Sequence, residues 1–491
     1  MKILLKSILL FIVVIFPKDY TAQKRSDSID TFIMHKMQEL KIPGLQLAIV
    51  RNDKIDQLSS YGLANIEHHI PTKNNTVFSI NSMTKAFVGV AIMQLQEQGK
   101  LKTDDVISKY LIDIPESWKK ITIKQLLSNT SGLPNNIDQK EQVFGEGIES
   151  KNWEIVKTLP MEFSPGEKFS YNQTGYFILG KIITQLSGIH FTKFIEDHQF
   201  KPSQLLVTQF GDSNDIIENS AGAYSIIINN EGKWINDGKL HHVFATFPVF
   251  FRTATGIMSS AEDLSKWLLA LQEGKLLKDK KSITELFTTI KLNNGDVGGF
   301  NKLTNGYALG WPTVVRSEHP AVAPVGGMRS TLFVYPQDHL SIVVLTNLQG
   351  SNPEWFIDEI AGYYIPGMKA ENGFGLSPYM KMLYLQTIAD GYQNVDSVYQ
   401  KIKKKNKNFK VSEDEINSWG YQMVGRNLKN EALVVFKLNT ELFPNSSNVF
   451  DSYGEILDAL GRKEEAVVNY KKSLLLNPDN INAVNYLKDK K

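Results

Sequence analysis

Residues 78–93, with the sequence FSINSMTKAFVGVAIM, predict a buried helix that begins beside a serine and a lysine. The eight residues after Lys85 are apolar on every side, and a helix without a polar face lies in a protein interior. Ser82 and Lys85 are three positions apart, so they share a face near the start of this helix. Burial favours the neutral form of an amine, and the free N–H groups of a helix start favour a negative oxygen. The pair therefore suits a serine nucleophile and a lysine that takes its proton.

The same pattern has a structural interpretation, in which Ser82 caps the helix and Lys85 extends its charged end to solvent. Ser-x-x-Lys occurs once more, at 117–120, where Ser117 follows Pro-Glu and precedes two lysines. That context is typical of a surface helix start. The tetrad alone leaves both interpretations open, and its apolar surroundings favour 82–85 as the reactive pair.

Two predicted hairpins enclose a series of predicted helices. The hairpins pair 45–50 with 55–61 and 331–335 with 342–346, and the helices between them cover 82–98, 123–127, 176–186 and 261–271. Strands at both ends of a region with helices between them predict one antiparallel sheet that both ends complete, with the helices packed on its faces. The expected fold class is α+β.

Composition excludes several kinds of chemistry. The 54 Lys+Arg and 52 Asp+Glu residues nearly balance, which gives no electrostatic reason to expect a nucleic-acid partner. The chain has no cysteine, so disulfides, cysteine-ligated metals and a thiol nucleophile are impossible. The histidine pairs at 68–69 and 241–242 are adjacent in sequence and point apart on a strand. We expect neither a metal nor a cofactor.

The first 22 residues have the order of a secretory signal. Lys2 and Lys6 precede an apolar run at 7–16, and Ala22 offers a small residue at a cleavage point. The formal net charge of +2 lies entirely in this segment. We expect export to the periplasm or the medium, with a retained N-terminal membrane anchor as the alternative.

The tail repeats itself after 34 residues. Trp419-Gly420, Ala432, Phe436 and Pro444 recur as Tyr453-Gly454, Ala466, Tyr470 and Pro478, which is typical of tetratricopeptide repeats. The expected organisation is a signal at 1–22, a main domain at 23–368, a helical linker at 369–410 and the repeats at 411–491, closed by a helix at 481–490. Such repeats predict a protein partner.

Several segments together resemble the serine β-lactamase-related family of class C β-lactamases, DD-peptidases and esterases. They are 78–85, 121–134, 164–176, 255–264, 307–311 and the glycine pair at 326–327. The resemblance follows the order of the family from about residue 30 to 350. It implies a β-lactamase-like fold with Ser82 as the nucleophile and Lys85 as its partner.

The resemblance also implies further site residues, with two departures. Tyr171 matches the tyrosine that moves the proton, while Gln173 stands where relatives have an asparagine that holds the substrate. Gly326 precedes Gly327, whose N–H would bind the oxyanion beside that of Ser82.

The second departure concerns the strand before this glycine pair. Relatives carry a lysine or histidine there, and Pro324 occupies the position in this chain. Arg329 is a candidate for the missing positive charge toward a substrate carboxylate. Its alternative is a solvated strand residue.

The sequence thus predicts an exported serine acyl-hydrolase for a β-lactam, a D-amino-acid peptide or a small ester. One alternative is a non-catalytic protein that binds cell-wall peptide or a protein partner, since two motif positions are altered. Another is that the repeats carry the function and the larger domain is a scaffold.

Overall fold

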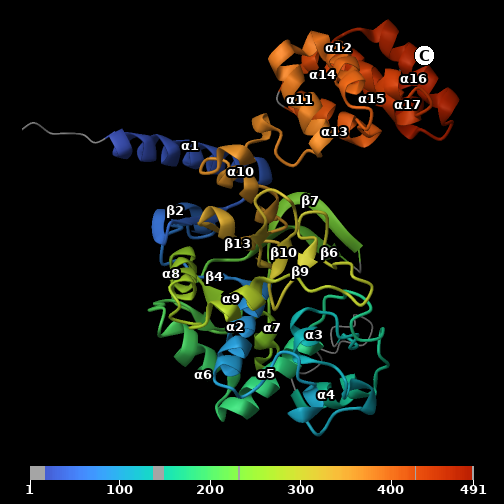
Figure 1. Ribbon diagram of the computed structural model, residues 1–491. Helices are drawn as coiled ribbons and strands as arrows, with labels where there is room; N and C mark the ends of the chain where they lie inside the picture. Colours follow the sequence, from blue (N-terminus) through green and yellow to red (C-terminus); the bar gives the residue numbers. More distant parts are fainter. Residues whose placement is uncertain (1–16, 136–148, 231–232, 426, 489–491) are drawn as a thin grey trace, which may run out of the picture. The chain divides into compact units, whose positions relative to one another are not determined.

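The computed structural model describes residues 17–135, 149–230, 233–425 and 427–488, and the chain divides into two compact units (Figure 1). The first unit ends at Tyr363 and the second begins at Tyr364. The expected boundary, at 368, lies five residues later in the chain.

A nine-stranded sheet forms the body of the first unit, in the order β3-β2-β1-β14-β13-β11-β10-β9 with β12 paired to β13. Each pair of neighbouring strands is antiparallel. The strand that follows α1 lies beside a strand from the far end of the unit, with Leu47 opposite Val344. Both predicted hairpins and the predicted closure of the sheet are therefore confirmed. The strands are β1 (Gly44–Arg51), β2 (Lys54–Asn65), β3 (Ile70–Pro71), β9 (Gly306–Tyr307), β10 (Pro312–Val314), β11 (Ala321–Val322), β12 (Val325–Gly326), β13 (Ser330–Tyr335) and β14 (Leu340–Thr346).

Helix α2 (Thr84–Glu97) is buried on every side from Thr84 to Leu95, as the sequence predicts. It packs against α5 (Thr174–Ser187), α6 (Phe191–Ile195), α7 (Arg252–Thr255) and α9 (Lys280–Phe287), which Figure 1 shows around it. Close packing explains the motif at 307–311: a side chain on Gly89 of α2 would collide with the backbone oxygen of Leu309. The central helix is thus fixed by backbone contacts as well as by apolar burial.

The remaining predicted helices are present, and smaller elements complete the unit. Helices α3 (Ile123–Leu127) and α8 (Ala261–Gln272) match their predicted ranges to within a residue. The others are α4 (Glu149–Thr158), α10 (Ile357–Ala361), β4 (Phe78–Ser79), β5 (Gln209–Phe210), β6 (Tyr224–Asn230), β7 (Lys233–His242), β8 (Ile257–Ser259) and β15 (Leu348–Gln349).

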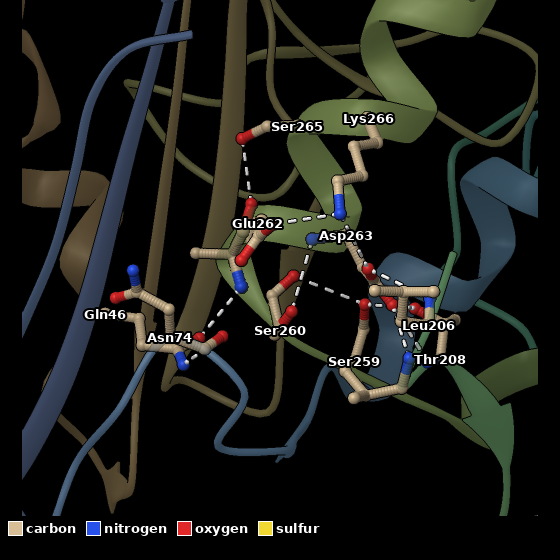
Figure 2. A network of polar contacts seen from close by, with 12 residues as sticks. Gln46, Asn74, Leu206, Thr208, Ser259, Ser260, Glu262, Asp263, Ser265 and Lys266 are labelled. Carbon is tan, nitrogen blue, oxygen red and sulfur yellow. Dashed lines mark hydrogen bonds and ion pairs between the residues drawn. The ribbon is translucent and has the colours of Figure 1, made fainter. Parts of the chain in front are cut away.

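A polar network anchors the start of α8 (Figure 2). Asp263 is 2% exposed, and its carboxylate accepts hydrogen bonds from the backbone N–H groups of residues 206–208 at 2.8–3.1 Å. Ser260 caps the helix by accepting from the Asp263 N–H at 3.2 Å, and the Thr208 hydroxyl bonds Ser259 at 2.8 Å. The carboxylate thus joins α8 to the chain before β5, and the Thr208 hydroxyl extends the network to β8, which explains the 255–264 motif.

The N-terminal helix α1 (Pro17–Leu40) has a larger role than the sequence suggested. Ile29 and Ile33 are fully buried, and the Phe32 ring contacts Phe356 at 6.3 Å between centroids. Residues 1–16, which hold the apolar run of the predicted signal, lie outside the described residues, and the predicted cleavage point at Ala22 falls within α1. In the part of the chain that the structure describes, no helix has the length and apolar character needed to cross a membrane.

The second unit is helical throughout its regular elements. They are α11 (Pro378–Asp390), α12 (Val395–Lys405), α13 (Glu413–Gly425), α14 (Lys429–Leu442), α15 (Ser447–Ala459), α16 (Lys463–Leu476) and α17 (Ile481–Lys488). The segment expected as a linker is helical, but it does not stand apart, because Leu383, Val398 and Ile402 share a core with Trp419 and Phe436. The basic run 403–405 forms the last turn of α12 and is exposed.

Candidate active site

Ser82 lies on a tight turn between β4 and α2. The turn is one 3-10 helix at Asn81–Met83, in which the Met83 N–H donates to the Ile80 oxygen at 3.1 Å. Asn81 has φ of +48°, a conformation that L-residues rarely adopt and that the neighbouring contacts must stabilise. Helix α2 itself is capped by Met83 without a side-chain hydrogen bond, so the interpretation of Ser82 as a helix cap is wrong. The Ser82 side chain is left half-buried on the turn.

Lys85 is 1% exposed, which overturns the interpretation that its charged end reaches solvent. Its Nζ donates to the Ala254 carbonyl oxygen at 2.8 Å and lies 4.7 Å from the centre of the Tyr171 ring. No carboxylate of the described residues pairs with it. Burial therefore holds the pKa of Lys85 well below its usual 10.5. A neutral amine one helical turn from a serine hydroxyl is a group that can accept a proton.

The Ala254 carbonyl is a site group that the sequence did not reveal. It belongs to α7, just before β8, and β8 pairs with β4 so that Ser259 lies opposite Phe78. The Ile257 N–H donates to the Thr84 hydroxyl at 3.1 Å, which ties the same segment to the start of α2. The contact with Lys85 is made by a backbone oxygen, which no particular residue type at 254 would indicate. The sequence signal near it was the adjoining motif at 255–264.

Tyr171 is half-buried beside the pair. Burial raises the pKa of its phenol to about 12, and hydrogen bonds from the Ser82 and Gln173 side chains lower it in part. The phenol is therefore protonated at neutral pH. The Phe300 ring, which is 40% exposed, packs edge-to-face with the Tyr171 ring, and the two ring centroids are 4.9 Å apart. The structure thus brings Ser82, Lys85 and Tyr171 together, while the catalytic roles expected of them stay predictions.

The motif at 121–134 supports the segment that carries Tyr171. Asn129 accepts hydrogen bonds from Ser170 and Asn172, the residues on either side of Tyr171, at 2.9 and 3.1 Å. Asn172 in turn donates to the Leu133 oxygen at 2.7 Å. Gln173 is 7% exposed, and its Oε1 accepts no hydrogen bond from the described residues. An enclosed acceptor without a donor is costly, which makes Gln173 a candidate for a contact with substrate.

The Gly326-Gly327 turn lies against the turn that holds Ser82. A side chain on Gly326 would collide with the Ile80 oxygen. Gly327 has φ of +56°, and an added Cβ would come within 2.8 Å of the Asn81 Cγ. The Arg329 N–H closes the turn on the Gly326 oxygen at 3.1 Å. The two turns are therefore in contact, while an oxyanion hole of the Ser82 and Gly327 N–H groups stays a prediction.

Pro324 and Arg329, the two unusual positions near this turn, have different surroundings in the structure. The Pro324 oxygen accepts from the Leu332 N–H at 2.9 Å, so this position serves the sheet. Arg329 is 5% exposed, and the interpretation as a solvated strand residue is wrong. Burial lowers the pKa of its guanidinium to about 10. Arg329 Nη2 donates to Asn81 Oδ1 at 3.4 Å, and the role predicted for it toward a substrate carboxylate stays untested.

An antiparallel sheet with a Ser-x-x-Lys pair at the start of a buried helix is the arrangement of β-lactamase-like serine hydrolases. The Beta-lactamase family model matches residues 29–362, and the chain belongs to that family. Protein flp of Staphylococcus aureus (strain MW2) is 29% identical over 329 residues, which cover 65% of this chain and 62% of that protein. The match thus leaves more than a third of that relative's length outside it.

Solved structures agree on the fold. The octameric penicillin-binding protein homologue from Pyrococcus abyssi has a TM-score of 0.60 at 24% identity and covers 73% of this chain and 81% of that one. A class C β-lactamase in complex with cefoxitin has a TM-score of 0.57 at 20% identity, with coverage of 70% and 99%. These likenesses establish the β-lactamase-like fold, whose expected α+β class is confirmed.

Proposed function

We propose that this protein is an exported serine acyl-hydrolase that works through an acyl-enzyme on Ser82. The observation that carries the proposal is Lys85: a buried amine with no carboxylate partner among the described residues, placed one turn from a half-buried serine hydroxyl. A buried charge without a partner is strongly unfavourable, so a fold that retains this lysine gains from its neutral form. A proton acceptor is the function that a neutral lysine in this place serves best.

The residues divide the reaction between them. The Ser82 hydroxyl gives its proton to Lys85, with the Tyr171 oxygen as hydrogen-bond partner, while Oγ attacks the carbonyl carbon of an ester or amide. The N–H groups of Ser82 and Gly327 would stabilise the oxygen that becomes negative. As the bond to the leaving group breaks, its oxygen or nitrogen takes a proton from the Lys85–Tyr171 pair. Water then attacks the acyl-enzyme by the same proton transfers, which releases the acid and restores Ser82.

The second Ser-x-x-Lys tetrad offers a matched control for the test. Hydrolysis by Ser82→Ala and Ser117→Ala variants is compared with that of the unaltered protein on a panel of a chromogenic cephalosporin, a D-alanyl-D-alanine peptide, a p-nitrophenyl ester and an L-peptide. We expect Ser82→Ala to lose turnover of whichever class is hydrolysed and Ser117→Ala to keep it. Turnover that survives in Ser82→Ala would show that the assignment is wrong.

The altered motif positions keep a binding role as the second candidate. Pro324 supplies no side-chain donor, and the enclosed Gln173 Oε1 lacks a described donor. A protein that only binds cell-wall peptide would take up a D-alanyl-D-alanine peptide without releasing D-alanine. Equilibrium dialysis of the peptide, with free D-alanine measured in the same sample, separates the two functions.

We infer that α13–α16 are two tetratricopeptide repeats that bind a protein partner. Support comes from equivalent contacts 34 residues apart: Gly420 packs against the Phe436 ring and Gly454 against the Tyr470 ring. Ala432 and Ala466 are both fully buried in these helix pairs.

For export, the mass of the protein recovered from the producing cells tests cleavage after Ala22. An unchanged N-terminus would favour the membrane anchor.

A further inference from the structure

A cavity of about 270 Å³ is lined in part by Phe78 and Ser79, which precede the Ser82 turn. Phe78 of β4 and Met258 of β8 form part of its wall, and Arg329 and Thr346 also line it. Ser82, Lys85 and Tyr171 are not among its lining residues. Its volume falls just below the range of about 300–1,000 Å³ that is usual for small-molecule pockets.

Arg329 is a buried cation whose hydrogen bonds are largely unused. Its Nε is fully enclosed and donates to no described residue, and Nη2 makes one long bond of 3.4 Å to Asn81. No hydrogen bond from Nη1 to a described residue is present, and Arg329 is one of the residues that line the cavity. No carboxylate of the described residues pairs with Arg329. Guanidinium groups in such surroundings bind carboxylates.

The lining also includes acidic side chains. Asp212 and Asp215 line the cavity, and one arginine serves both: Arg252 Nη2 is 2.6 Å from Asp215 and 3.8 Å from Asp212. Asp212 also accepts from the backbone N–H groups of Asn214 and Phe247, at 2.8 and 2.6 Å. Within the described ranges, these two carboxylates share one cation, which leaves an excess negative charge. His242, the remaining titratable side chain of the lining, contacts Glu67 at 2.6 Å.

We propose that this cavity binds a small zwitterion of the α-amino-acid class, with its carboxylate on Arg329 and its ammonium group toward Asp212 and Asp215. A simple anion would gain the contact with Arg329 but would meet the acidic side chains, and a simple cation would meet Arg329. A molecule with both charges satisfies both the guanidinium and the carboxylates, and only a small one fits the volume. The apolar wall at Phe78 and Met258 accommodates a short side chain.

Occupancy of this site acts on the Ser82 turn through Asn81. Asn81 holds the Arg329 guanidinium by a single long hydrogen bond and directly precedes Ser82. A carboxylate on Arg329 competes for the same donor group. Binding at the cavity therefore changes the support of the turn without contact with the reacting atoms.

Isothermal titration tests the proposal with three probes of similar size: L-alanine, sodium acetate and methylammonium chloride, with D-alanine as a further arm for chirality. The full chain carrying Ser82→Ala is used alongside the unaltered protein, because equal affinity in both places the ligand outside the reactive site. We expect one alanine enantiomer to bind at least about tenfold more tightly than acetate or methylammonium. Acetate binding as tight as that of alanine would overturn the zwitterion, and no heat from either enantiomer would overturn the site.

Two variants connect the binding to its residues. Arg329→Met replaces the guanidinium with an apolar chain of similar length. Asp215→Asn removes the negative charge of Asp215, the more exposed of the two carboxylates. We expect Arg329→Met to weaken alanine binding at least about tenfold and Asp215→Asn to weaken it at least about fivefold. If Arg329→Met fails to fold, Asp215→Asn alone decides. Alanine affinity that is unchanged in Asp215→Asn and in any folded Arg329→Met would overturn the assignment.

Discussion

Lys85 combines two properties that conflict in a structural residue, since it is buried and no carboxylate in the described part of the chain pairs with it. A buried amine without a partner destabilises a fold, and an apolar side chain of similar length would pack there without that cost. We therefore expect Lys85→Met to keep or raise the melting temperature while it lowers acylation by on the order of a thousandfold. Circular dichroism melting and the rate of labelling by a fluorophosphonate measure the two effects.

Lys120 is the matched control for this substitution, because it ends the second tetrad and is exposed. Lys120→Met should change neither the melting temperature nor the labelling rate. A large loss of stability in Lys85→Met would instead mean that the amine is structural.

The pH dependence of acylation belongs to the same residue. Lys85 accepts a proton only when neutral, and burial lowers its pKa, so labelling should rise with pH and level off well below 10.5. The phenol of Tyr171, with a pKa of about 12, stays protonated over this range and adds no second step. Tyr171→Phe should therefore lower the plateau rate without moving the midpoint.

The lowered pKa of Lys85 also affects how the stability of the fold depends on pH. The unfolded chain binds a proton on Lys85 up to a higher pH than the folded chain does, so this residue makes the fold less stable as pH falls. The difference in melting temperature between Lys85→Met and the unaltered protein should widen as pH decreases below 10.5. A difference that is constant with pH would contradict a lowered pKa.

At the scale of the element, the glycine turn beside Ser82 makes a specific prediction. Gly327→Ala places a Cβ against Asn81 and forces an L-residue to φ of +56°. The backbone conformation alone costs roughly 1–2 kcal/mol, and displacement of the turn should lower acylation about a hundredfold. Gly295→Ala is the control, since Gly295 has φ of +89° with open space around it. The control should lose stability but no activity, as unfolding and labelling experiments can show.

The repeated glycines of the second unit predict unequal effects from one substitution. Alanine gains about 0.5–1 kcal/mol over glycine in a helix. At Gly420, however, the added Cβ would lie 2.5 Å from the buried Phe436 ring, while at Gly454 the nearest ring atom of Tyr470 is at 3.2 Å. Gly420→Ala should destabilise α13–α14, and Gly454→Ala should be close to neutral. Hydrogen exchange of the amides in 413–476 measures both, and equal effects would contradict the described packing.

At the scale of the whole molecule, sequence patterns predicted what repeats or alternates. The alternating apolar residues of the strands and the all-apolar α2 are local patterns that specify their structure, while the assignment of the 34-residue period to tetratricopeptide repeats stays a prediction. The contacts of Lys85 with a carbonyl 169 residues away and the burial of Arg329 depend on how distant segments meet. No local pattern encodes such meetings. For the same reason, the apolar contacts of α1 and the shared core of the 369–410 segment were not predictable.

The central claim is that Ser82 is the nucleophile, and it is tested most directly by acylation of the intact full-length chain. The protein is treated with a fluorophosphonate, its mass is measured, and the modified peptide is sequenced by fragmentation. The account predicts a single adduct on Ser82, present in Ser117→Ala and absent from Ser82→Ala and Lys85→Met. A folded protein that takes up no adduct, or carries it on another residue, would contradict the account.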